Sequence, residues 1–162
     1  MISERQKLKI DTFVNIVKEL SNLSVASRKK VACMSLKIDF TKIGSMGYNG
    51  SFKGDLANES TGTEELSYTP GHSGLIHAEQ NMLIKFRESN PQNYIILLTL
   101  SPCEMCAKLL INADFNKIYW IEEYRDTTSL AMFERCGIRY GNIEKLYEDY
   151  PEIYTKFKSN HS

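Results

Sequence analysis

The chain has 162 residues, 42% hydrophobic and 25% charged, which is typical of a globular protein that folds as one domain, residues 1–162. Its 20 Lys and Arg balance 20 Asp and Glu, which argues against nucleic acid as a partner without excluding it, because nucleic-acid-binding proteins usually carry a basic excess. No apolar run approaches the roughly 20 residues of a membrane span, and residues 1–20 lack a signal-peptide core, so we expect a cytoplasmic protein without a membrane partner.

The first half of the chain predicts a helix, a β-hairpin and a long irregular segment. Apolar residues on one stripe indicate an amphipathic helix over 4–22. Two strand-like runs, 30–38 and 42–48, follow it and are joined by a turn at 39–41. From 49 to 74 the sequence is rich in Gly, Ser, Thr, Asn and Pro, and irregular segments of this length are often functional.

Helices and strands alternate in the second half of the chain. The predicted elements are a helix over 75–88, a strand over 94–100, a helix over 101–113, a strand over 117–121, a helix over 126–136, two weak strand candidates at 138–140 and 143–146, and a helix over 149–158. Ser101 is the predicted N-cap of the second of these helices, with Pro102 at its first position and Glu104 completing a capping box. This order predicts an α/β layer sandwich with a mixed central sheet.

Two short motifs carry the residues that point to a metal. A His-Ala-Glu triplet spans 77–79, and a Pro-Cys-x-x-Cys motif spans 102–106 at a predicted helix start. Cys103 and Cys106 share one helical face and lie in the first turn, where unpaired N–H groups and the helix dipole favour thiolate over thiol. Zinc binds thiolates, and His77 would add a nitrogen ligand, which makes three ligands from the protein.

The number of ligands distinguishes a structural from a catalytic zinc site. A structural site fills all four tetrahedral positions, whereas a catalytic site leaves the fourth to water. Other candidates for a fourth ligand have simpler roles: His72 lies in a Gly-rich loop, Cys33 alternates with apolar residues in a strand, and Cys136 ends an amphipathic helix. We therefore expect one catalytic Zn²⁺ per chain.

Glu79 is the predicted proton-transfer residue. It lies on the helix of His77 but on another face, so it is badly placed to bind the same ion and well placed to reach water bound there. Zinc lowers the pKa of such water to ~7, and a neighbouring carboxylate can carry its proton to a substrate ring and a leaving amine. Either motif alone is weak evidence, but His-x-Glu followed by Pro-Cys-x-x-Cys is the signature of zinc nucleobase deaminases.

At this point the chain resembles the cytidine deaminase superfamily, and within it most closely the deoxycytidylate (dCMP) deaminases. The residues that carry the resemblance are Ser27-Arg28, Gly47-Tyr48-Asn49-Gly50, His77-Ala78-Glu79-Gln80-Asn81, Leu100-Ser101-Pro102-Cys103-Glu104-Met105-Cys106-Ala107-Lys108 and Tyr124-Arg125-Asp126. The resemblance implies a three-layer α/β fold with a five-stranded mixed sheet flanked by helices. It also implies a homo-oligomer, from dimer to hexamer, and conversion of dCMP and water to dUMP and ammonia.

The resemblance also implies a set of substrate contacts. Asn49 would hydrogen-bond the sugar or base, and the backbone at Ala78 and Ser101 would read the pyrimidine edge. Arg28 would contact the phosphate, and Tyr124 would form a wall of the pocket. Two of these residues also have a simpler explanation, since Asn49 is a good turn residue and Arg28 opens a charge run that solvent can satisfy.

Alternative functions stay open at this stage. The same chemistry could act on tRNA adenosine or single-stranded DNA cytosine, which needs basic contacts and stacking aromatic residues. The side chains that would support such a substrate are Lys29, Lys30, Lys53, Tyr48, Phe52 and Tyr68. A free base such as guanine would need no phosphate site. In a non-catalytic zinc-stabilised binding domain, the fourth alternative, Glu79 would be dispensable.

Overall fold

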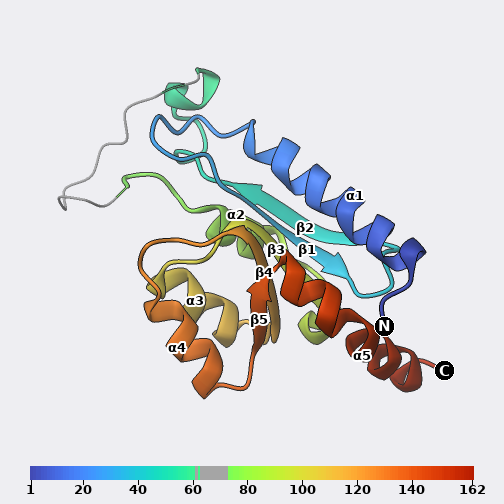
Figure 1. The fold of residues 1–162 in the computed structure, drawn as a ribbon. Coiled ribbons are helices and arrows are strands. Elements are labelled where there is room, and N and C mark those ends of the chain that lie inside the picture. Colours follow the sequence, from blue (N-terminus) through green and yellow to red (C-terminus); the bar gives the residue numbers. More distant parts are fainter. Residues whose placement is uncertain (61, 63–72) are drawn as a thin grey trace.

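The computed structural model describes residues 1–60, 62 and 73–162, and in this part of the chain helices flank both faces of a β-sheet (Figure 1). The elements, in chain order, are α1 (Glu4–Ser21), β1 (Ala32–Lys37), β2 (Ile43–Tyr48), the 3₁₀ turn η1 (Leu56–Glu59), α2 (Ala78–Lys85), the 3₁₀ turn η2 (Pro91–Asn93), β3 (Tyr94–Leu100), α3 (Glu104–Asn112), β4 (Lys117–Glu122), α4 (Thr128–Arg135), β5 (Arg139–Asn142) and α5 (Ile143–Asn160). None of the described helices combines the length and apolar composition that a membrane-spanning helix needs.

The sheet is mixed, with five strands in the order β2-β1-β3-β4-β5. β1 runs antiparallel to both of its neighbours, whereas β3, β4 and β5 are parallel to one another. A parallel connection needs a crossover, which α3 and α4 supply. The predicted three-layer α/β fold with a five-stranded mixed sheet is thus confirmed.

Each face of the sheet has its own hydrophobic core. Met34 and Leu97 pack with α1 and α5 on one face, whereas Cys33 and Leu98 pack with α2, α3 and α4 on the other. Alternate residues of β1 and β3 therefore contribute to opposite cores. Burial on both faces explains why Tyr94–Leu100 is an unbroken apolar run.

The structure corrects the predicted start of the helix over 75–88 and the predicted strand at 143–146, because backbone pairing and helix capping decide both. α2 begins at Ala78, not at 75, because the backbones of Ile76 and Gly50 pair instead, with N···O distances of 3.1 and 2.8 Å. The run 143–146 is helical rather than a strand. Here the Asn142 side chain accepts a hydrogen bond from the Lys145 N–H (3.0 Å) and starts α5 one residue after β5 ends.

Candidate metal centre

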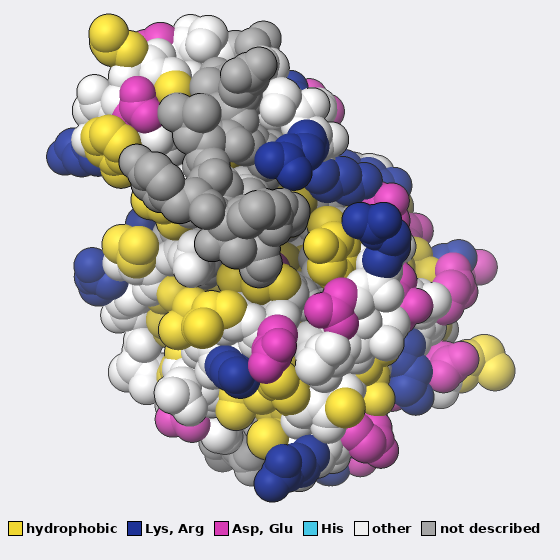
Figure 2. Space-filling view, turned by 90° about the vertical axis from the view of Figure 1, so that its left-hand side faces the viewer, with side chains coloured by type: hydrophobic (Ala, Val, Ile, Leu, Met, Phe, Trp, Pro, Cys, Tyr) yellow, Lys and Arg dark blue, Asp and Glu magenta, His cyan; other side chains and the backbone are white. Residues whose placement is uncertain are grey.

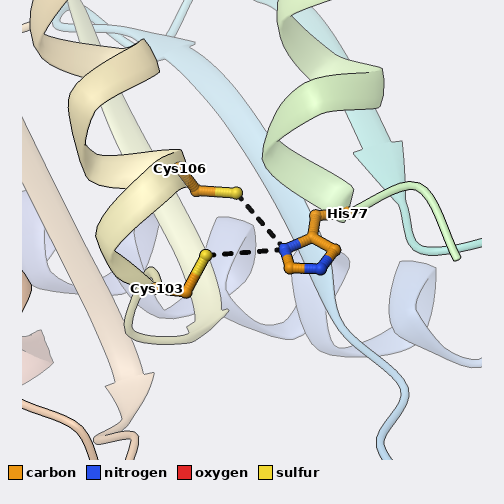
Figure 3. A group of neighbouring side chains, drawn as sticks. All are labelled: His77, Cys103 and Cys106. Atoms are coloured by element: carbon orange, nitrogen blue, oxygen red, sulfur yellow. Dashed lines mark hydrogen bonds between the residues drawn. The ribbon is translucent and has the colours of Figure 1, made fainter. Parts of the chain in front are cut away.

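Three side chains from two helix starts converge on one point (Figure 3). His77 Nδ1 lies 3.6 Å from Cys103 Sγ and 3.4 Å from Cys106 Sγ, and the three donor atoms all lie within 4.8 Å of one another. For Zn–N near 2.0 Å, Zn–S near 2.3 Å and tetrahedral angles, nitrogen and sulfur ligands should be about 3.5 Å apart. The donor set and its spacing therefore fit zinc.

Local helix capping puts these donors in place. His77 is the N-cap of α2, and its backbone N–H donates to Gln80 Oε1 (2.8 Å). Cys103 is the N-cap of α3, so the prediction that Ser101 caps this helix is wrong. The Ser101 hydroxyl instead accepts a hydrogen bond from the N–H of Tyr124 (2.7 Å), a residue that follows β4. The thiols still lie at the positive end of the helix dipole.

The pKa values of the two thiols are shifted in opposite directions. The pKa of Cys103 is lowered to about 4, chiefly by a hydrogen bond from the Cys106 thiol and further by His77, against the effect of partial burial. Hydrogen bonding to Cys103 and burial raise the pKa of Cys106. A metal ion bound by both sulfurs would need both as thiolates, so its binding would release the Cys106 proton.

Glu79 is a buried carboxyl group beside this centre. Its side chain is 4% exposed, and burial raises its pKa from 4.5 to about 7. The negative charge of Cys103 raises the pKa further, while a backbone hydrogen bond and His77 oppose the shift. A carboxyl group with a pKa near neutrality can both accept and donate a proton at the pH of a cell.

The raised pKa of Glu79 predicts how the stability of the metal-free protein depends on pH. A group whose pKa is higher when folded binds its proton more tightly in the native state, so stability falls as pH rises from about 4.5 to about 7. Glu79→Gln removes this loss. From pH 4 to pH 8, the difference in the free energy of unfolding between the two proteins should therefore shift in favour of the variant by up to about 3 kcal/mol. Urea unfolding of both proteins across this range measures it. A difference in the free energy of unfolding that does not change with pH would contradict the raised pKa of Glu79.

A cavity of about 770 Å³ opens beside the centre. The predicted metal ligands, proton-transfer residue and substrate contacts on its wall are Arg28, Asn49, His77, Ala78, Glu79, Ser101, Cys103 and Tyr124. The structure therefore brings all five predicted substrate contacts together with two of the metal ligands and Glu79. The third ligand, Cys106, is fully buried behind the wall. His72 and Tyr68 lie outside the described residues.

The Asn49 side chain holds the loop beside the cavity through hydrogen bonds. Its Oδ1 accepts hydrogen bonds from Ser24 Oγ (2.6 Å) and the Val31 N–H (2.9 Å), and its Nδ2 donates to the Lys29 carbonyl (2.8 Å). One amide hydrogen of Nδ2 has no acceptor in the part of the chain that the structure describes. Asn49 thus has a structural role and keeps one donor for a ligand on the cavity wall.

The backbone groups at Ala78 and Ser101 differ in what they offer. The Ala78 N–H lies in the first turn of α2, where helices leave N–H groups unpaired. The Ser101 N–H is already used, because it donates to the Glu122 carbonyl (2.9 Å). A ligand can therefore find a donor at Ala78 and an acceptor at the Ser101 carbonyl. Tyr124, 38% exposed, lies on the same wall.

Three further cations lie on the cavity wall, Lys29, Lys108 and Arg125. The sequence pointed to Lys29 only for a nucleic-acid substrate, and it gave Lys108 and Arg125 no role beyond their place in the motifs of the resemblance. Two of the three cations form ion pairs, Lys29 with Glu122 (2.6 Å) and Lys108 with Glu104 (3.1 Å). Arg125 has no carboxylate partner among the described residues. Its place in the Tyr124-Arg125-Asp126 motif was the signal that could have given it a role at the site.

Comparison with known proteins gives a consistent family. The model of the cytidine and deoxycytidylate deaminase zinc-binding region matches residues 8–122. The Caenorhabditis elegans protein named "Probable deoxycytidylate deaminase" is 29% identical over 141 residues, 85% of this chain and 71% of that protein. The deoxycytidylate deaminase of Mus musculus is 27% identical over 128 residues, 75% and 70% of the two chains. The crystal structure of dCMP deaminase from cyanophage S-TIM5 in complex with dCMP and dUMP has a TM-score of 0.66 and 26% identity, covering 88% of this chain and 99% of that one.

Proposed function

The chain belongs to the cytidine and deoxycytidylate deaminase zinc-binding family, and on this premise we propose that it converts dCMP and water to dUMP and ammonia. The observation that carries the proposal is the His77, Cys103 and Cys106 triangle, spaced for zinc, beside a buried Glu79 in a cavity. The substrate follows from the deoxycytidylate deaminases of worm and mouse and from the phage enzyme bound to dCMP and dUMP.

Glu79 carries the protons in this proposal. His77, Cys103 and Cys106 would hold zinc, which would supply a Lewis acid that lowers the pKa of water to about 7. The Glu79 carboxylate takes a proton from water and delivers it to the ring nitrogen N3, next to the carbon C4 that is attacked. A second proton passes through Glu79 from the hydroxyl group now on C4 to the amino group, the C4–N bond breaks, and ammonia leaves as C4 becomes a carbonyl.

The cavity wall offers groups that complement a cytosine nucleotide. The Ala78 N–H suits the base carbonyl, the Ser101 carbonyl suits the amino group, and Asn49 keeps one amide hydrogen for the sugar or base. We assign the phosphate contact to Arg28, and Arg125 on the same wall adds a second positive charge. Tyr124 forms a side wall. The chain is neutral overall, but cations gather at this cavity.

Ammonia release from a panel of substrates tests the proposal. The zinc-loaded protein should turn over dCMP with a kcat/KM roughly 10- to 100-fold above that for deoxycytidine, because charged hydrogen bonds to the phosphate are lost with the nucleoside. Arg28→Ala is the control and should raise the KM for dCMP while leaving the KM for deoxycytidine nearly unchanged. Equal turnover of nucleotide and nucleoside would contradict the phosphate site.

The same panel should include guanine, a tRNA anticodon stem-loop and a single-stranded DNA oligonucleotide. Turnover of the polynucleotides alone would keep the chemistry and overturn the substrate. Figure 2 shows basic side chains on one face of the molecule interspersed with acidic and hydrophobic ones, whereas a nucleic-acid channel needs a continuous basic surface.

Assembly into a homo-oligomer, from dimer to hexamer, and a cytoplasmic location stay predictions. Exposed apolar side chains on α2 and α3 support assembly, since Ile84 is 62% and Leu109 36% exposed. Apolar side chains in such positions are suited to contact with another chain.

A further inference from the structure

Gly47 of β2 lies directly beneath the backbone of α2. In the strand register it is opposite Cys33, which packs against Ala78 and Met82 of that helix. A Cβ atom added at Gly47 would lie 2.5 Å from the Ala78 carbonyl oxygen and 2.5 Å from the Met82 nitrogen. These are backbone atoms and cannot rotate away, so any larger residue must move the helix.

The two atoms that would be struck belong to one turn of α2. In an α-helix the N–H of residue i donates to the carbonyl of residue i−4, so Met82 and Ala78 form the bond that closes the turn carrying Glu79. Glycine is not needed here for its backbone conformation, because the glycines with positive φ in the described chain are at 54, 62, 137 and 141. What Gly47 supplies is the absence of a side chain.

Two hydrogen bonds hold the helix to the same strand on either side of this contact. Asn81 Nδ2 donates to the Tyr48 carbonyl (2.9 Å), and Ser45 Oγ donates to the Met82 carbonyl (2.9 Å). The strand therefore fixes α2 along its length before the chain continues to Asn49 on the cavity wall. The close approach at Gly47 sets how deeply the helix lies on the sheet.

We propose that Gly47 is a positioning residue, which places Glu79 and His77 at the correct distance from the two thiols of α3. The inference rests on the proposed function, because it assumes that this centre holds zinc. His77 Nδ1 already has zinc-compatible separations of 3.6 and 3.4 Å from the sulfurs of α3, a different helix. Moving α2 away from the sheet changes both distances together, and a misplacement of about 1 Å can lower a rate about 10²-fold.

A comparison of Gly47→Ala with Gly44→Ala tests the proposal. Gly44 lies on the same strand, and a Cβ atom there would also be crowded, 2.8 Å from a ring atom of Tyr94 and 2.9 Å from one of Phe86. Those are side-chain atoms, so Gly44→Ala should lower the thermal midpoint while leaving the α2 backbone in place. Gly47→Ala should weaken zinc binding about 10- to 100-fold, measured by competition with a chromophoric chelator, and lower kcat for dCMP about 10²-fold.

Equal zinc affinity and kcat in the two variants would overturn the proposal. If Gly47→Ala does not fold, Asn81→Ala loosens the same contact without a clash and should lower zinc affinity and kcat in the same direction. A wild-type zinc affinity together with a wild-type kcat in Asn81→Ala would then overturn the proposal. A wild-type protein that binds zinc but deaminates nothing refutes the proposed function, whereas the zinc affinities still decide the role of Gly47.

Discussion

Replacing Glu79 by Gln is expected to lower kcat for dCMP by about 10²- to 10⁴-fold, the range that a positioned general acid–base group contributes. Glutamine has nearly the same shape but neither accepts nor releases a proton at neutral pH. The three metal donors lie on other residues, so zinc content should stay at one ion per chain. Catalysis and metal binding should therefore separate in this variant.

Steady-state ammonia release and metal analysis of the same preparation measure both effects. Glu104→Gln is a matched control, because Glu104 also lies on the cavity wall but is exposed and pairs with Lys108 (3.1 Å). It should change kcat little. Residual turnover in Glu79→Gln above about a tenth of the wild-type value would remove Glu79 from the proton-transfer role. In a non-catalytic zinc domain, wild type and variant would both be inactive.

Short sequence motifs were enough to predict the metal donors, because each motif brings its donors to one helix start. The helix starts at 77–79 and 102–106 carry their donors in a few consecutive residues, and the structure brings those donors together. The prediction that Ser101 caps α3 is wrong because a group distant in sequence competes for the Ser101 hydroxyl. The N–H of Tyr124, 23 residues away, takes the oxygen that a capping box would have used, and Cys103 becomes the cap. A tertiary contact of this kind leaves no local signal.

The composition of the cavity wall could not be predicted from local sequence patterns either. Arg28 and Arg125 are almost a hundred residues apart in sequence, and only the strand order brings their loops to one cavity. Gly47 stood out in the sequence as part of a turn-like motif, Gly-Tyr-Asn-Gly. Its close approach to the α2 backbone became visible only when the helix was placed over β2. Sequence reasoning therefore found the reactive groups, while the residues that position them follow from packing.

Cys106→Ala should nearly abolish both zinc binding and turnover. Cys106 is fully buried and supplies one of three donors, so its loss leaves two donors for an ion that prefers four ligands. We expect zinc affinity to fall by more than about 100-fold, beyond the 10- to 100-fold that partners outside the first coordination shell cost. Metal analysis after dialysis, together with dCMP turnover, measures both losses.

Cys33→Ala is the matched control for this prediction. Cys33 is also fully buried on the α2 side of the sheet, but its sulfur is not part of the donor group. Its truncation should cost stability through a small cavity and leave one zinc per chain. Zinc retained in Cys106→Ala, or lost equally in both variants, would place the metal elsewhere. Because two apolar cores hold the sheet without using the three donors, metal-free Cys106→Ala should still unfold cooperatively.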